Sequence, residues 1–351
     1  MPTRVSVIIP TYNRSALVVR AINSALASTS PGDEVLVIDD GSTDDTEAAV
    51  RSLGDAIRYV RIKNAGPGAA RNRGIELAEC PFLTFLDSDD EWLPDKLQLQ
   101  RKVMEKYSDV VFCFGNLSIK RRSGETLHDA LSYFRADLNV GSADINTPLA
   151  EILGPGVPFS SIAALPTGRS DFNIHVGDMY PVQMDVHYVT SDTVMVRKEL
   201  AGARFRYPED VRLMEDWECF ARLSKMGPVA YLDCELAVWV NHGGFRLTDV
   251  DGISQATRRI SLLQRVWGAD EQFLGAHAAR YQSLLNSQYL KRSKFMIKAG
   301  QLTEAKADLR ACGGPLSYRI VASLPPFLVK ITLWARRKVR GLGTRVRRLL
   351  K

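Results

Sequence analysis

Residues 82–97 read FLTFLDSDDEWLPDKL, and this stretch decides the fold class. An apolar strand at 82–86 runs directly into Asp87-Ser88-Asp89-Asp90, and a helical pattern follows at 94–107. Apolar strands that alternate with helices are typical of a parallel sheet covered on both faces. Carboxylates at the end of a buried strand repel one another and lose hydration, so a cation or hydrogen-bond donors must compensate them.

The same order of strand, polar turn and helix recurs upstream. We expect strands at residues 5–9, 34–38 and 57–62 and helices at 15–27, 43–53 and 67–78. Ligands of such sheets bind beyond the carboxyl ends of the strands. Polar residues gather at three of these ends, in Thr11-Tyr12-Asn13, Asp39-Asp40 and the acidic run that starts at Asp87. The sequence therefore predicts an α/β fold with a ligand site at one edge of a mostly parallel central sheet.

The rest of the chain is less regular. Residues 120–190 are rich in Gly, Pro, Ser and Asp, and we interpret them as an irregular insertion that faces the substrate. Strand and helix patterns resume after residue 190, and the spacing is helical from about 253 to 312. We therefore divide the chain into a first domain of residues 1–245, a helical region of residues 246–315 and a basic tail of residues 316–351.

The net charge of +6 comes from that tail, because residues 330–351 hold nine Lys or Arg and no acid, which leaves −3 for the rest. A nucleic-acid-binding body would carry positive charge on its folded surface, so we expect no nucleic-acid partner. The five cysteines show no CxxC spacing, no apolar run is long enough to span a bilayer, and the first residues, MPTRVSVIIPTYN, lack the features of a signal peptide. We expect a cytoplasmic protein with reduced thiols.

Asp87 and Asp89 are candidate ligands of a hard divalent cation, since Mg²⁺ typically takes one or two carboxylates together with substrate phosphates. The same residues are also typical of a turn and a helix N-cap, and the sequence leaves both interpretations open. His242, which precedes Gly243-Gly244, is a further candidate for metal or phosphate, although a lone histidine is more often structural.

Two other strand ends suit a nucleotide. Asp39 and Asp40 can accept hydrogen bonds from a ribose or a base, or they can shape the turn before the next helix. The glycine-rich stretch from residue 64 leads into a helix that carries Arg71, and this combination suits a diphosphate. It matches neither the Walker pattern nor GxGxxG, and tight packing of small residues on the sheet is the alternative.

Asp216 lies in the first turn of a predicted helix at 215–226. It is the candidate general base, because an ionised carboxylate can remove the proton of an attacking hydroxyl. Acids are also common in a first helical turn because they complement the helix dipole.

Four stretches in register, VSVIIPTYNR, VLVIDDGSTDDT, NAGPGAARNRG and FLDSDDEW, resemble glycosyltransferase family 2, the inverting enzymes of the GT-A fold. The likeness covers residues 5–117 and returns near 192–241, where Glu215-Asp216-Trp217 resembles the ED-aromatic motif of the family. His242-Gly243-Gly244 resembles the motif that follows the base.

The resemblance implies a GT-A fold with a Rossmann-like sheet and a sugar donor activated by a nucleotide diphosphate, most commonly UDP in this family. It implies that Asp216 is the catalytic base and that Mg²⁺ or Mn²⁺ binds at Asp87, Asp89 and His242. The acceptor would be a hydroxyl of a glycan or lipid-linked precursor of a cell-surface polysaccharide. The implied donor-binding residues are Pro10, Thr11, Tyr12, Asn13, Asp39, Asp40, Arg71, Asp87 and Ser88.

Residues 327–338 place apolar and aromatic side chains beside a basic run, which suits a helix on the anionic inner face of a membrane. A solvated terminus or a helix docked on the body are the alternatives. Two other functions compete with the transferase: a nucleotidyltransferase of similar α/β fold, and an inactive membrane-associated nucleotide-binding protein. A nucleotidyltransferase would need no acceptor base, and an inactive binding protein would have no need to retain both Asp89 and Asp216.

Overall fold

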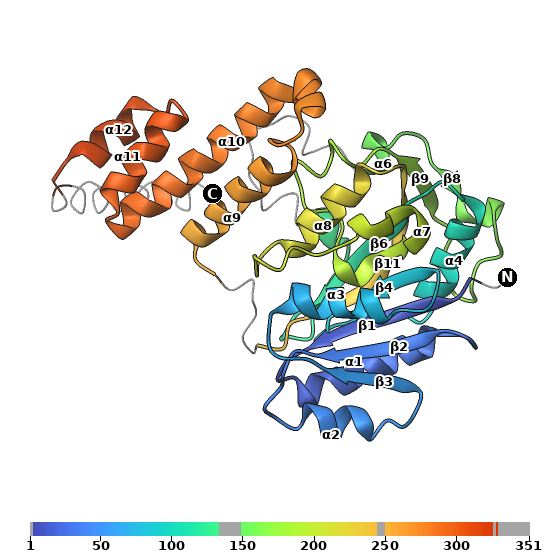
Figure 1. Ribbon diagram of the computed structural model, residues 1–351. Coiled ribbons are helices and arrows are strands. Elements are labelled where there is room, and N and C mark those ends of the chain that lie inside the picture. The colour runs from blue at the N-terminus through green and yellow to red at the C-terminus, as the bar shows by residue number, and fades with distance from the viewer. Residues whose placement is uncertain (1–2, 133–148, 244–249, 326–327, 329–351) are drawn as a thin grey trace, which may run out of the picture. The chain divides into compact units, whose positions relative to one another are not determined.

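The computed structural model describes residues 3–132, 149–243, 250–325 and 328, and the chain divides into two compact units, residues 1–246 and 247–351 (Figure 1). The described residues of the first unit form one sheet in the order β3-β2-β1-β4-β10-β6-β11-β9-β8, with β5 paired to β11 and β7 to β6. The strands are β1 (Val5–Thr11), β2 (Glu34–Asp39), β3 (Ile57–Arg61), β4 (Phe82–Phe85), β5 (Glu91–Trp92), β6 (Phe112–Lys120), β7 (Thr126–Leu127), β8 (Val157–Pro158), β9 (Asn173–Gly177), β10 (Met195–Arg197) and β11 (Val229–Val240).

Helices cover both faces of this sheet. They are α1 (Ser15–Ser28), α2 (Thr46–Arg51), α3 (Pro67–Leu77), α4 (Lys96–Lys106), α6 (Leu149–Ile152), α7 (Lys198–Ala201) and α8 (Glu215–Ser224), with 3₁₀ turns η2 (Phe159–Ser161), η3 (Ser191–Thr193) and η4 (Gly202–Arg204). Side chains alternate along β1, so Val7 packs in the core beneath α1 and α4 while Ile8 packs in the core beneath α3 and α8. A Cβ at Gly74 of α3 would lie 2.3 Å from Cγ2 of Ile8, so this helix needs a glycine to approach the sheet.

The sheet is parallel over β3, β2, β1 and β4, as the sequence predicts, and mixed beyond β4. Strand β10 runs antiparallel between β4 and β6, while β11 is parallel to β6. Strand β11 is continuous from Val229 to Val240, and its register with β6 shifts between Leu232 and Ala237. The helix predicted at 43–53 begins later, at Thr46, since residues 43–45 belong to the turn that precedes it.

The second unit is helical, which confirms the predicted helical region. It contains α9 (Gly252–Val266), α10 (Glu271–Ala299), α11 (Leu302–Ala311) and α12 (Leu316–Ser323). Asp251 and Asp270 cap α9 and α10 by accepting backbone N–H groups. None of the helices among the described residues is both long and apolar enough to cross a bilayer. The predicted membrane helix at 327–338 lies, apart from Leu328, outside the described residues.

Candidate functional site

The predicted polar strand ends do meet at one edge of the sheet. Strand β1 pairs with β2 on one side and β4 on the other, and Thr11 lies opposite Asp39 in the register. Pro10 lies within β1, Thr11 and Ser88 are almost buried, and Tyr12 is 47% exposed. Among the described residues, the buried hydroxyl of Thr11 has no hydrogen-bond partner. This edge therefore combines an accessible aromatic ring with an unsatisfied hydroxyl.

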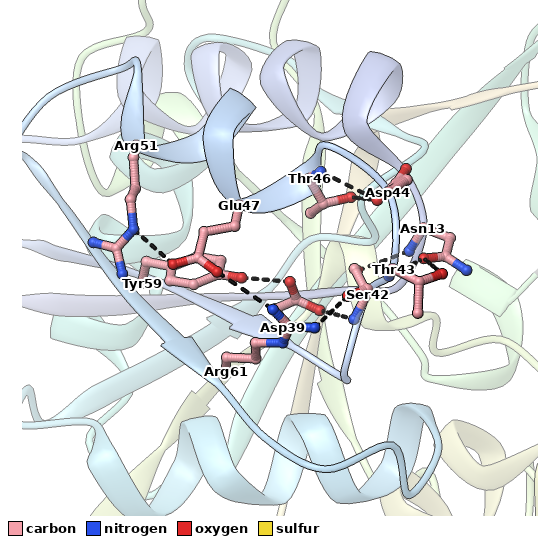
Figure 2. Close-up of polar contacts among 10 residues, drawn as sticks. All are labelled: Asn13, Asp39, Ser42, Thr43, Asp44, Thr46, Glu47, Arg51, Tyr59 and Arg61. Carbon is pink, nitrogen blue, oxygen red and sulfur yellow. Dashed lines mark hydrogen bonds and ion pairs between the residues drawn. The ribbon is translucent and has the colours of Figure 1, made fainter.

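Asp39 is wholly buried at the end of β2, and its carboxylate shapes the turn that follows (Figure 2). Its Oδ1 accepts the backbone N–H of Ser42 at 2.7 Å, and its Oδ2 accepts the hydroxyl of Tyr59. Burial and this carboxylate raise the pKa of Tyr59, so the phenol stays a donor. Asn13 joins the same turn, because its Oδ1 accepts the N–H of Thr43 at 2.7 Å. In the structure Asp39 shapes the turn, as one of its two interpretations predicted. Its role as a ligand of a ribose or base stays a prediction.

Asp40 shapes the next loop in a similar way. Its two oxygens accept the backbone N–H groups of Ala65 and Gly66, at 2.7 and 2.8 Å. Burial raises the pKa of Asp40, although these hydrogen bonds oppose the rise. Gly66 has a φ of 99°, which favours glycine at the start of α3. Each carboxylate oxygen keeps a second lone pair, so a ligand contact at Asp40 remains chemically open.

Arg71 is the central cation of the site. It is 5% exposed, and its guanidinium donates to Oδ1 of Asp87 at 2.6 Å and to Oε1 of Glu215 at 2.9 Å. Burial raises the pKa of both carboxyl groups, while Arg71 acts in the opposite direction. The guanidinium also lies over the ring of Tyr207, at 5.2 Å from its centroid. Arg71 thus joins the end of β4 to the start of α8, and the sequence assigned no role to its partner Glu215.

The three acids after β4 have three different partners. Asp90 is buried and accepts the backbone N–H of Val240 at 2.8 Å, so it fastens the loop to β11. The N–H of Asp87 donates to Oδ1 of Asp192 at 2.7 Å, a contact that the sequence did not predict. Carboxylate oxygens of Asp87, Asp90 and Asp192 lie within 4.8 Å of one another. Burial raises the pKa of both Asp90 and Asp192. Each of these carboxylates accepts a backbone N–H, and these hydrogen bonds explain why the two acids lie in this cluster.

Asp89 lies beside His242, another of the predicted metal ligands, and a metal bound by these two residues stays a prediction. Oδ2 of Asp89 lies 2.8 Å from Nε2 of His242 and 3.6 Å from the guanidinium of Arg14. These donor atoms belong to residues 153 positions apart in the chain. Carboxylate and imidazole groups together suit Mn²⁺, and the carboxylates of Asp87 and Asp89 suit Mg²⁺. The residues present therefore fit a divalent cation.

Asp216 lies in the first turn of α8, two residues after Met214, whose φ of 59° is left-handed. Its Oδ1 accepts the backbone N–H of Trp217 at 2.8 Å, and its Oδ2 lies 3.3 Å from Nε2 of His187. Burial opposes ionisation of Asp216, but its contacts with His187, Arg71 and the N–H of Trp217 outweigh burial, and the pKa of Asp216 is lowered. The carboxylate is therefore ionised at neutral pH. No sequence pattern indicated His187, which lies in the irregular insertion.

The first part of the chain is similar to proteins of one family. Residues 6–150 match the family described as Glycosyl transferase family 2. Over 121 residues the chain is 45% identical to an uncharacterized glycosyltransferase of Rickettsia felis. This alignment covers 34% of this chain and 20% of that protein. Over 124 residues it is 40% identical to the GalNAc(5)-diNAcBac-PP-undecaprenol beta-1,3-glucosyltransferase of Campylobacter jejuni. That alignment covers 34% of this chain and 39% of that protein. The chain thus spans well under half the length of these relatives.

The fold has a counterpart among solved structures. Residues 1–349 of S. aureus TarS, in complex with UDP-GlcNAc, align with a TM-score of 0.56 and 17% identity, over 95% of this chain and 88% of that chain. This likeness shows a shared fold and confirms the predicted GT-A fold class.

Proposed function

Because residues 6–150 match glycosyltransferase family 2, we propose that the chain transfers a sugar from a nucleotide-diphosphate sugar to an acceptor hydroxyl with inversion at the anomeric carbon. The observation that carries this proposal is the bridge formed by Arg71. Arg71 links Asp87, in the predicted metal loop, to Glu215, the neighbour of the predicted base, which lies 144 positions from Arg71 in the sequence. A metal loop and a base within one ion-pair network suit a reaction in which a diphosphate leaves as a hydroxyl attacks.

In this mechanism Asp216 accepts the proton of the acceptor hydroxyl, whose oxygen attacks the sugar from the face opposite the nucleotide. The lowered pKa keeps Asp216 ionised before the attack. The buried Arg71 keeps Asp87 and Glu215 in place. When bound at Asp87, Asp89 and His242, a divalent cation supplies positive charge that offsets the charge of the leaving diphosphate.

For the donor we propose a uridine diphosphate sugar. The C. jejuni relative is described as a glucosyltransferase, an E. coli relative is described as using UDP-Glc, and the solved TarS structure contains UDP-GlcNAc. Tyr12 is the exposed ring at the strand ends, and the buried hydroxyl of Thr11 lacks a partner there. The remaining proposed donor-binding residues are Pro10, Asn13, Asp39, Asp40, Arg71, Asp87 and Ser88.

For the acceptor we propose a hydroxyl of a lipid-linked glycan, reached from the cytoplasmic face of a membrane. Two relatives are described as acting on sugars linked to diphosphoundecaprenol. In the second unit, a groove of about 400 Å³ between α11 and α12 is lined by apolar side chains and by Lys306, Arg310 and Arg319. Leu316 and Ile320 on its rim are 69% and 53% exposed. Apolar side chains ringed by cations suit an anionic membrane surface, and the basic residues 330–351 would add to this attraction.

Nucleotide-sugar binding tests the proposal. UDP-GlcNAc and UDP-glucose are titrated into the wild type and Asp89→Ala with Mn²⁺, Mg²⁺ or EDTA, and Asp45→Ala serves as a control acid outside the site. We expect metal-dependent binding that Asp89→Ala abolishes and Asp45→Ala keeps. Binding of neither sugar, or equal binding in EDTA, would contradict the proposal. The comparisons give no support to a nucleotidyltransferase or to an inactive binding protein.

A further inference from the structure

The side chain that lies beside the proposed base comes from the insertion for which the sequence showed no pattern. The imidazole of His187 stacks on the indole of Trp217, with ring centroids 4.9 Å apart and planes 7° from parallel. Its Nε2 lies 3.3 Å from Oδ2 of Asp216, whose Oδ1 accepts the N–H of Trp217. One oxygen of the carboxylate thus accepts a hydrogen bond from the helix backbone, while the other lies at ion-pair distance from His187, whose Nε2 makes no hydrogen bond among the described residues.

The segment that carries His187 is fastened to α8, the helix that carries Asp216. The indole N–H of Trp217 donates to the backbone oxygen of Gln183 at 2.8 Å. The side-chain amide of Gln183, which is fully buried, donates in turn to the backbone oxygen of Phe220 and to Oγ of Ser224, at 3.2 and 3.1 Å. These hydrogen bonds join the segment that carries His187 to the helix that carries Asp216. They therefore set the position of His187 relative to Asp216.

We propose that His187 is a positioning residue that holds the carboxylate of Asp216 in the orientation needed to receive the acceptor proton. The inference rests on the proposed function, since Asp216 is a base only if the chain transfers a sugar. In the described part of the chain, His187 is the one ion-pair partner of Asp216. A carboxylate held by its own backbone alone can rotate about its side-chain bonds, and a misplaced base slows proton transfer. The insertion then serves the reaction centre directly.

Steady-state kinetics of three variants test this role. The measured reaction is UDP release from UDP-GlcNAc and UDP-glucose with Mn²⁺. His187→Ala should lower kcat about 10- to 100-fold while the donor KM stays within about twofold. His187→Gln keeps a nitrogen donor for Oδ2 and should recover most of the loss. His128→Ala is the matched control, because that imidazole is exposed and pairs with Glu235 outside the site.

The double variant separates positioning from an independent effect. If His187 acts through Asp216, the variant His187→Ala/Asp216→Asn should be no slower than Asp216→Asn alone. Multiplied losses, unchanged kcat in His187→Ala, or a raised KM with unchanged kcat would overturn the inference, and the last result would make His187 a substrate contact.

A spectroscopic readout needs no turnover. In imidazole ¹⁵N NMR spectra, the His187 signal should move in Asp216→Asn and stay in place in Asp45→Ala. An unmoved signal in Asp216→Asn would overturn the contact itself. If the wild type binds no nucleotide sugar, the proposed function fails and this role of His187 fails with it, whereas an active wild type and an equally active His187→Ala contradict only the present inference.

Discussion

Replacement of Arg71 by Met removes the cation that joins the carboxylates of Glu215 and Asp87. The guanidinium side chain is 6% exposed and that of Glu215 is 10% exposed, whereas that of Asp87 is 34% exposed and partly screened by solvent. Loss of one partner from a buried ion pair costs about 3–5 kcal/mol, because a charge stays behind in the interior. Most of this loss should come from Glu215, and the more exposed Asp87 adds at most about 1 kcal/mol. We expect Arg71→Met to lower the free energy of unfolding by about 3–5 kcal/mol at pH 7.

Urea denaturation of metal-free protein measures this loss, with Arg73→Met as the matched control. Arg73 lies on the same helix, and its exposed ion pair with Glu76 is worth about 0–1 kcal/mol. The pKa of Glu215 is already raised above 4.5 in the fold, and loss of Arg71 raises it further, so protonation relieves the variant. The deficit of Arg71→Met should therefore shrink as the pH falls from 7 toward 5. A deficit equal to that of Arg73→Met, or one that grows on acidification, would refute the reasoning.

Three further results are expected. Burial lowers the pKa of Lys96 to about 7. The free energy of unfolding of the wild type should therefore rise by up to about 1.4 kcal/mol per pH unit between pH 7 and 10, and Lys96→Met should lack this rise in urea denaturation. Parallel pH profiles of the two proteins would contradict this expectation. Leu316→Glu/Ile320→Glu should weaken sedimentation with phosphatidylglycerol vesicles at least severalfold, while donor binding persists; unchanged sedimentation would remove α12 from the membrane proposal. Chelation of Mn²⁺ by EDTA should abolish UDP-GlcNAc binding reversibly, and binding that survives EDTA would argue against a metal at Asp89.

Local patterns predicted the parts of the site that depend on chain order. The apolar strands before Asn13, Asp40 and Asp87 fix which residues follow each strand, and parallel pairing then brings these ends to one edge. A turn after Asp39 was also foreseeable, because Asp39 and Ser42 are typical turn and cap residues, but the turn extends three residues further than predicted, to residue 45. Asp89 and His242 were both named from the sequence, and the structure places them 2.8 Å apart.

Contacts between distant segments could not be predicted in this way. Glu215 meets Arg71, Asp192 meets the amide of Asp87 and His187 meets Asp216 only because η3 and α8 pack beside β4 and α3. Periodicity reports which face of an element is buried, and it carries no information about which element covers that face. Lys96 shows the same limit. Its ammonium group is fully buried and donates hydrogen bonds to Thr84 and Gln100, and no charge pattern in the sequence indicates these contacts.

The central claim is that a nucleotide-sugar site and a carboxylate base act together in this chain, and Asp216→Asn tests it most directly. UDP-GlcNAc and UDP-glucose binding is measured by calorimetry with Mn²⁺, and UDP release is measured on the same preparations. The account predicts that Asp216→Asn binds the donor as the wild type does and loses at least about 100-fold in turnover, since a general base contributes about 10²–10⁴-fold. Wild-type turnover in Asp216→Asn would contradict the account.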